Sequence, residues 1–189
     1  MADKYTKIEP KIHPITLFAI IGFLVVVVGL IFIFKPQDDT VIFAAYEATA
    51  TSDFTEDHPF VTVSYDGSLF KKGLAKIIQQ EEIVLVYVGF SQCPSCQVHI
   101  GPFQKYFTAE GFDEYVSKIY YLNTSEDFDG VTAFIADYPE VTDSTPQLLV
   151  FKNGVVVATF TPVSTEDTTL INRSVRDFYR EAIAAINEE

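Results

Sequence analysis

Both cysteines of this chain lie in one short stretch, and that stretch limits what the chain can fold into. Residues 83–88 are apolar and mostly β-branched, which predicts a buried strand. A break at 89–92 is followed by the sequence Cys-Pro-Ser-Cys at 93–96. Because proline suits the first turn of a helix, we expect a helix over 95–107, with a kink at 102. A strand, a loop, a CxxC motif and a helix in this order form the layout of a dithiol active site.

The position of the first cysteine suits a nucleophile. Cys93 is expected directly before the helix, where unpaired N–H groups and the helix dipole favour an anion. The thiolate is the nucleophile in disulfide exchange. Cys96 lies one turn further on and is expected to be more buried, so we expect it to resolve the mixed disulfide that Cys93 forms. Pro94 begins the predicted helix, and the Ser95 hydroxyl either donates to the Cys93 sulfur or faces water.

The chief alternative is that the two cysteines are inert or hold a metal. Zinc normally takes four ligands, and the other candidates of the right type are His13, His58 and His99. His13 precedes the apolar segment described below, and His99 is expected to be a partly exposed residue of the helix. Gln97 follows the second cysteine, which excludes the CxxCH signature of haem attachment. We therefore predict a redox dithiol with no metal and no resident cofactor.

A second motif lies further along the chain. Thr145-Pro146 precedes an apolar run, and Asn153-Gly154 separates this run from a second one at 155–160. Asn-Gly between two apolar runs is the strongest short β-hairpin signal. The proline would open the first strand of this hairpin. A trans proline is also tolerated at the edge of a sheet, so the pattern by itself leaves the isomer of Pro146 open.

With the CPSC motif, the Thr145-Pro146 pair and the hairpin, the chain from residue 60 to its end resembles the thioredoxin superfamily. The resemblance implies that the Thr145–Pro146 bond is cis and packs against the dithiol. It also implies that the backbone of Thr145 pairs with a substrate peptide in extended form.

The chain departs from thioredoxins at several positions. Tyr87 stands where thioredoxins carry a buried acid, Gln92 replaces the tryptophan before the first cysteine, and the chain has no tryptophan. The helix proline comes one residue later than in thioredoxins, which makes Gly101 a candidate for a bulge. These differences argue against a general cytosolic reductase. The chain looks more like the membrane-bound thioredoxin-like proteins of bacteria, among them the bacteriocin-transport accessory type.

Residues 15–34 form an apolar run with one threonine and no charge. At 1.5 Å per residue, a helix of this length spans the bilayer core of about 30 Å. A buried core helix is a poor alternative, because this run is apolar all round and has charged flanks. A cleaved signal peptide would have a shorter apolar region and a small-residue cleavage site just beyond it. We therefore predict an uncleaved transmembrane helix over 15–34.

The basic residues near this segment set its expected orientation. Lys4, Lys7 and Lys11 precede it, whereas acidic residues follow it closely. The positive-inside rule then places residues 1–14 in the cytoplasm and the rest of the chain outside. The predicted localisation is a single-pass cell-membrane protein with an extracytoplasmic catalytic domain.

Residues 35–59 are expected to be a linker, with a short strand or helix over 41–46, and residues 60–189 are expected to form the folded domain. Hydrophobic periodicity in that domain predicts the element order β-α-β-α-β-α-β-β-α. This order implies an α/β fold, a thioredoxin-like mixed sheet with helices on both faces. The predicted strands are 60–65, 83–88, 118–122, 146–152 (opened by the proline) and 155–160, and the predicted helices are 69–80, 95–107, 131–138 and 168–187.

The charge balance narrows the class of partner. The formal net charge is −13, and no basic stripe with interleaved aromatic residues occurs. These features argue against a nucleic-acid partner.

Three functional hypotheses follow. The first is a membrane-anchored, extracytoplasmic thiol–disulfide oxidoreductase that acts on thiols or disulfides of exported proteins. It would contact membrane lipid through 15–34 and would be recycled by a membrane or extracytoplasmic redox partner. The motif does not determine whether it oxidises or reduces its substrates. The second is a redox-inactive binding or accessory module of an export system, and the third is a metal-handling thiol protein using Cys93, Cys96 and His99.

Overall fold

A computed structural model of the chain describes residues 13–33, 38–50, 54–68, 71–163 and 167–188. The chain divides into two units, Met1–Pro36 and Gln37–Glu189.

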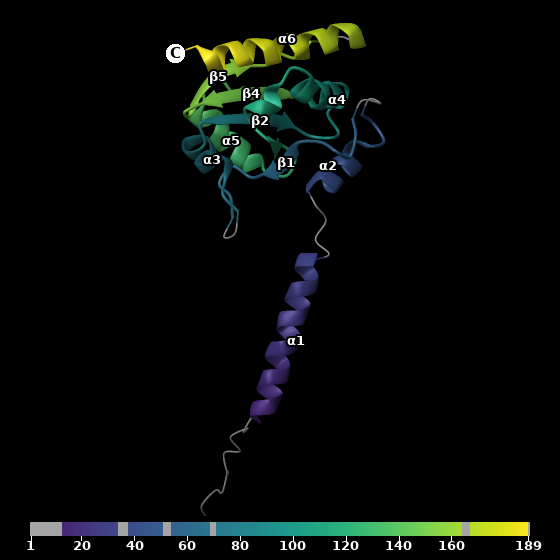
Figure 1. Cartoon of the computed structure of the whole chain (residues 1–189), viewed down its shortest axis with the longest axis vertical. Helices are drawn as coiled ribbons and strands as arrows, with labels where there is room; N and C mark the ends of the chain where they lie inside the picture. Colours follow the sequence, from purple (N-terminus) through teal and green to yellow (C-terminus); the bar gives the residue numbers. More distant parts are fainter. Residues whose placement is uncertain (1–12, 34–37, 51–53, 69–70, 164–166, 189) are drawn as a thin grey trace, which may run out of the picture. The chain divides into compact units, whose positions relative to one another are not determined.

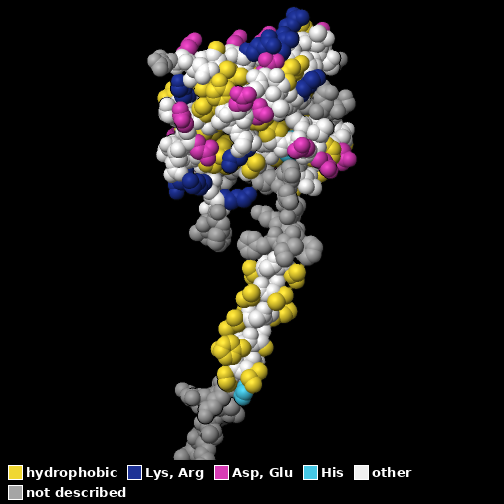
Figure 2. Space-filling view, in the orientation of Figure 1, with side chains coloured by type: hydrophobic (Ala, Val, Ile, Leu, Met, Phe, Trp, Pro, Cys, Tyr) yellow, Lys and Arg dark blue, Asp and Glu magenta, His cyan; other side chains and the backbone are white. Residues whose placement is uncertain are grey.

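The first unit contains helix α1, Pro14–Ile33, which coincides with most of the predicted membrane segment. Most of its described apolar side chains are exposed, Phe18 among them at 72 %, and Figure 2 shows them along the helix. In the described part of the chain, no helix is both long enough and apolar enough to cross a membrane. Phe34 and the side chains of 31–33 lie outside the described residues.

The second unit is built on a five-stranded mixed sheet with the order β1-β3-β2-β4-β5 (Figure 1). Strand β2 lies at its centre, parallel to β3 and antiparallel to β4. Strand β1 pairs in parallel with β3, and β5 pairs with β4 in antiparallel. The strand bounds are β1 Phe60–Val63, β2 Ile83–Gly89, β3 Ile119–Asn123, β4 Gln147–Lys152 and β5 Val155–Thr159.

Helices cover both faces of this sheet. Successive strand residues point to opposite faces, so an apolar strand presents apolar side chains that must be buried on each face. On β2, Leu85 and Tyr87 pack in one core layer and Val84 and Val86 in the other. The first layer is covered by α2, α4 and α6, and the second by α3 and α5. The helix bounds are α2 Asp38–Tyr46, α3 Leu74–Gln80, α4 Pro94–Ala109, α5 Phe128–Asp137 and α6 Thr168–Asn187, with a short 3-10 helix at Phe112–Glu114. The predicted fold class, a thioredoxin-like mixed sheet with helices on both faces, is confirmed for this unit.

The helix predicted over 69–80 begins later than expected. Helix α3 starts at Leu74, directly after Gly73. A side chain at Gly73 would collide with the backbone of Tyr65 and Asp66, so the chain crosses itself closely here. This close crossing, which only glycine permits, takes the place of helix at 71–73, and residues 69–70 of the predicted helix lie outside the described residues.

The predicted linker, 35–59, contains part of the core of the second unit. Residues 41–46 belong to α2, which packs against β1. Ile42 and Tyr46 on this helix are buried, and the Tyr46 ring packs edge-on against Phe54 with ring centroids 5.7 Å apart. The compact unit therefore begins at Gln37, ahead of the predicted domain start at 60.

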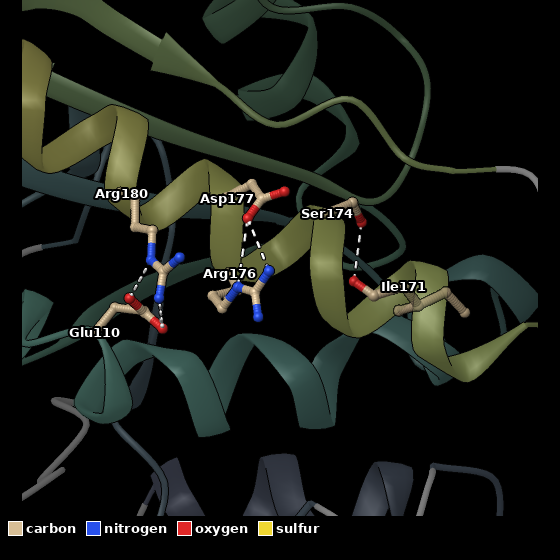
Figure 3. Close-up of polar contacts among 6 residues, drawn as sticks. All are labelled: Glu110, Ile171, Ser174, Arg176, Asp177 and Arg180. Atoms are coloured by element: carbon tan, nitrogen blue, oxygen red, sulfur yellow. Dashed lines mark hydrogen bonds and ion pairs between the residues drawn. The ribbon is translucent and has the colours of Figure 1, made fainter.

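The C-terminal elements hold α4 in place. The β4–β5 turn has positive φ at Asn153 and Gly154, as the Asn-Gly signal predicts. Figure 3 shows Arg180 of α6 reaching Glu110 at the end of α4, with Nε 2.7 Å from Oε2. In the interior, the Tyr179 hydroxyl donates to the Phe103 carbonyl oxygen at 2.9 Å. Helix α4, which carries the cysteine motif, is thus fixed along its length.

Candidate functional site

The first cysteine lies where the carboxyl end of β2 leads into α4. Cys93 is the N-cap of α4, and Pro94 is the first helical residue. The Cys96 backbone N–H donates to Cys93 Sγ at 3.2 Å. A sulfur in this position faces the unpaired N–H groups of the helix start, which stabilise negative charge. The structure therefore places Cys93 at the N-terminus of α4, as the sequence predicts.

The second motif meets the first at this point. The Thr145–Pro146 peptide bond is cis. The Thr145 hydroxyl donates to Cys93 Sγ at 3.3 Å, and the Thr145 carbonyl oxygen lies 3.7 Å from the same sulfur. Pro146 is buried, whereas Thr145 is partly exposed. The fold thus brings together the two sequence motifs, with Thr145 of one against the sulfur of the other.

The two sulfurs differ in accessibility. Cys93 is 6 % exposed and Cys96 is fully buried, and both thiols are free. Burial, together with the hydrogen bond to Cys93, raises the pKa of the Cys96 thiol to about 12. Cys96 is therefore a protonated thiol at neutral pH. An outer sulfur at a helix N-terminus and an inner, protonated one is the arrangement expected of an attacking and a resolving thiol.

Two residues of α4 differ from their predicted surroundings. The Ser95 hydroxyl lies 3.5 Å from His99 Nδ1, so its described neighbour is the histidine and not the Cys93 sulfur. The prediction that His99 is partly exposed is wrong, because this side chain is completely buried. Its position, three residues after Cys96 and four before Phe103, puts it on the helix face that forms the core.

The buried His99 ring is neutral at physiological pH. Nδ1 lies 2.7 Å from the Ser95 carbonyl oxygen, and the ring packs against Phe160 with centroids 5.5 Å apart. Burial lowers the pKa of His99. Among the described residues, no group of three or more His, Cys, Asp or Glu side chains is arranged to hold a metal ion.

The sequence does not predict that two tyrosines, Tyr87 and Tyr46, lie at this site. The Tyr87 hydroxyl is hydrogen-bonded to the Tyr46 hydroxyl at 3.2 Å, and it lies beside the Cys96 thiol. Gly89 leaves room for this contact: a Cβ at this position would lie 2.6 Å from the Tyr87 hydroxyl and 3.0 Å from Cys96 Sγ. The sequence marks Tyr87 only as a departure from thioredoxins. Tyr46 belongs to the predicted linker, and no local signal in the sequence pairs it with the dithiol.

No protein-family model and no curated protein matches this chain. Among solved structures, it is similar to the thioredoxin of Trypanosoma brucei brucei, with 14 % identity, a TM-score of 0.42, and coverage of 67 % of this chain and 97 % of that one. It is also similar to a mutant thioredoxin from Halobacterium salinarum NRC-1, with 17 % identity, a TM-score of 0.37, and coverage of 69 % and 95 %. A third is a thioredoxin of Plasmodium falciparum, with 25 % identity, a TM-score of 0.34, and coverage of 55 % and 88 %. The assignment of a thioredoxin-like fold therefore rests on this chain's own strand order and on the helices that cover both faces of its sheet.

Proposed function

We propose that this protein is a membrane-anchored, extracytoplasmic thiol–disulfide oxidoreductase that acts on exported proteins. One observation carries the redox part of the proposal. Cys93 Sγ lies at the N-terminus of α4 and accepts hydrogen bonds from Cys96 N–H and the Thr145 hydroxyl, while the Cys96 thiol lies buried behind it. Donors aimed at a single sulfur stabilise it as a thiolate, which is the reactive form.

The proposed reaction transfers two electrons between this dithiol and a substrate disulfide. The Cys93 thiolate attacks one substrate sulfur, a bond forms between them, and the substrate S–S bond breaks to release a thiolate that takes up a proton. Cys96 then attacks Cys93 Sγ, so that the protein disulfide forms and the second substrate thiol leaves. The substrate disulfide is reduced and the dithiol is oxidised. The reverse sequence oxidises a substrate dithiol, and the reduction potential of the Cys93–Cys96 pair determines which direction prevails.

Recognition of the substrate is proposed to use the backbone at Thr145. This residue is partly exposed, and its carbonyl oxygen lies within 3.7 Å of the reactive sulfur. A peptide that pairs with this backbone in extended form would carry its own sulfur toward Cys93. Backbone pairing is independent of side-chain sequence, which suits an enzyme that serves several exported proteins.

The location is proposed from the sequence. The apolar run 15–34 would anchor the chain in membrane lipid, and Lys4, Lys7 and Lys11 before it favour a cytoplasmic N-terminus. The catalytic domain would then face outward and would need a membrane or extracytoplasmic redox partner for recycling. The resemblance to bacterial membrane-bound thioredoxin-like proteins, including the bacteriocin-transport accessory type, supports the same arrangement.

The test is a redox titration of the full chain in detergent micelles, using glutathione buffers and gel-shift detection of free thiols. We expect a reversible Cys93–Cys96 disulfide that is absent from a Cys93→Ser variant. A potential near about −120 mV would mark a disulfide donor, and one near about −270 mV would mark a reductant. If no reversible disulfide forms, the enzyme proposal fails and a redox-inactive binding module takes its place. A protease-protection assay on intact cells tests the proposed orientation separately.

A further inference from the structure

The resolving step poses a problem for the buried cysteine. To attack Cys93, Cys96 must develop negative charge on its sulfur, yet this side chain is completely buried. Burial of a charge without compensating hydrogen bonds is strongly unfavourable, and here it raises the pKa of the thiol. A donor next to this sulfur would therefore accelerate the step.

The structure provides such a donor from the strand that precedes the motif. Tyr87 is fully buried, and its hydroxyl lies beside Cys96 Sγ: a Cβ built on Gly89 would be 2.6 Å from the hydroxyl oxygen and 3.0 Å from the sulfur. The ring lies along β2 toward Gly89, whose missing side chain opens the path between hydroxyl and sulfur. Burial raises the pKa of Tyr87 well above its ordinary value, so this hydroxyl stays protonated and acts as a donor.

A second tyrosine holds the first one. The Tyr46 hydroxyl lies 3.2 Å from that of Tyr87 and is hydrogen-bonded to it, and Tyr121 on β3 packs against the Tyr87 ring with centroids 5.2 Å apart. Tyr46 is itself fully buried. The titratable groups around Cys96 thus come from four elements: Cys93 on α4, Tyr87 on β2, Tyr46 on α2 and Tyr121 on β3.

We propose that the Tyr87 hydroxyl stabilises the Cys96 thiolate as it forms during resolution, and that Tyr46 keeps this hydroxyl in position. The inference rests on the proposed oxidoreductase function and adds a catalytic residue and a positioning residue to it. In the step concerned, Cys96 Sγ forms a bond to Cys93 Sγ, and the bond from Cys93 to the substrate sulfur breaks. The departing sulfur takes the electron pair and then the proton that Cys96 loses. Tyr87 keeps its own proton throughout.

The experiment uses the full reduced chain in detergent micelles and the aromatic disulfide 5,5′-dithiobis(2-nitrobenzoate) as the substrate disulfide. Attack by Cys93 releases one coloured thiolate, and resolution by Cys96 releases the second, so stopped-flow absorbance separates the two steps. In Tyr87→Phe we expect the second phase to slow about tenfold, which corresponds to about 1.4 kcal/mol, with the first phase unchanged. In Tyr46→Phe we expect a smaller slowing, about two- to fivefold, of the same phase only.

Tyr179→Phe is the matched control. This tyrosine is also fully buried and also loses one hydrogen bond, to the Phe103 carbonyl oxygen, but it belongs to α6. We expect both of its phases to match the wild type. The inference is overturned if Tyr87→Phe resolves at the wild-type rate, or if Tyr179→Phe slows resolution equally, which would mark a general loosening of the core. A different result, in which the wild type releases only one equivalent, would refute the oxidoreductase function itself and this inference with it.

Discussion

The narrow space between β2 and the dithiol makes Gly89 a sensitive position. Gly89→Ala adds one methyl group, whose carbon would lie 2.6 Å from the Tyr87 hydroxyl oxygen, 2.8 Å from the ring carbon that carries it and 3.0 Å from Cys96 Sγ. Carbon atoms pack at about 3.5–4.0 Å, so these neighbours must move. Tyr87 cannot swing away easily, because its ring is fully buried against Phe60 and Phe103, with centroids 5.5 and 5.7 Å away.

The expected cost follows from two contributions. Inserting a methyl group into a closely packed core costs about 1–3 kcal/mol. Displacing the Tyr87 hydroxyl breaks its hydrogen bond with Tyr46, which contributes about 1 kcal/mol more. We therefore expect Gly89→Ala to lower the free energy of unfolding by about 2–4 kcal/mol. Because Cys96 Sγ is also displaced, formation of the intramolecular disulfide should slow as well.

Urea unfolding of a fragment starting at Gln37, followed by circular dichroism, measures this cost. A double-mutant cycle supplies the control, because Tyr87→Leu removes the ring that the new methyl group would meet. In the Tyr87→Leu background we expect Gly89→Ala to cost at least about 1 kcal/mol less than in the wild type. The reasoning would be refuted by a cost below about 0.5 kcal/mol in the wild type, the range of ordinary surface substitutions, or by equal costs in both backgrounds.

Three further predictions concern other parts of the second unit. A fragment starting at Phe60 lacks three core side chains of α2 and the loop after it, and burial of each contributes about 1.5–3 kcal/mol. We therefore expect circular dichroism to show this fragment largely unfolded and the fragment from Gln37 folded. Equal folding of both fragments would contradict this. Burial lowers the pKa of His99, so below about pH 6.5 the unfolded chain binds a proton that the folded chain does not, and stability should fall as the pH falls through that range. In urea titrations from pH 8 to 5, His99→Leu should make the free energy of unfolding depend less on pH. An unchanged pH dependence in this variant would contradict the assignment to His99. Asp127→Ala removes the acceptors for the backbone N–H groups of Tyr65 and Gly130, so it should lower the free energy of unfolding by about 2 kcal/mol. Asp129→Ala, at an exposed neighbouring position, should lower it clearly less. Similar losses for the two variants would refute the role of these two hydrogen bonds.

The elements that could be predicted from the sequence are those whose signals are local. The apolar run before the cysteines, the proline after Cys93 and the Asn153-Gly154 turn each determine their own backbone conformation, and each is found as expected. Helical spacing alone could also have placed His99 in the core, because it shares one face with Cys96 and Phe103. His99 is buried because this face of the helix is turned toward the sheet.

What could not be predicted depends on contacts between distant segments. Residues 41–46 are too short and too mixed in pattern to identify as a core helix, and α2 is held by packing on β1 and not by a strong propensity of its own. The late start of α3 likewise depends on how closely Gly73 approaches the backbone of Tyr65. In both cases tertiary packing overrides the local pattern.

The dithiol shows why this distinction matters for function. In this chain the motif places the Cys93 sulfur at the helix N-terminus and the Cys96 sulfur one turn behind it. The ease with which the inner sulfur ionises depends instead on the groups around it, here a hydroxyl of β2 supported by one from α2. If the proposed role of Tyr46 is correct, a change in α2 would alter the proposed resolving step while leaving the motif intact. In the proposed mechanism the motif supplies the reacting sulfurs, and the rate of resolution depends on the fold around Cys96.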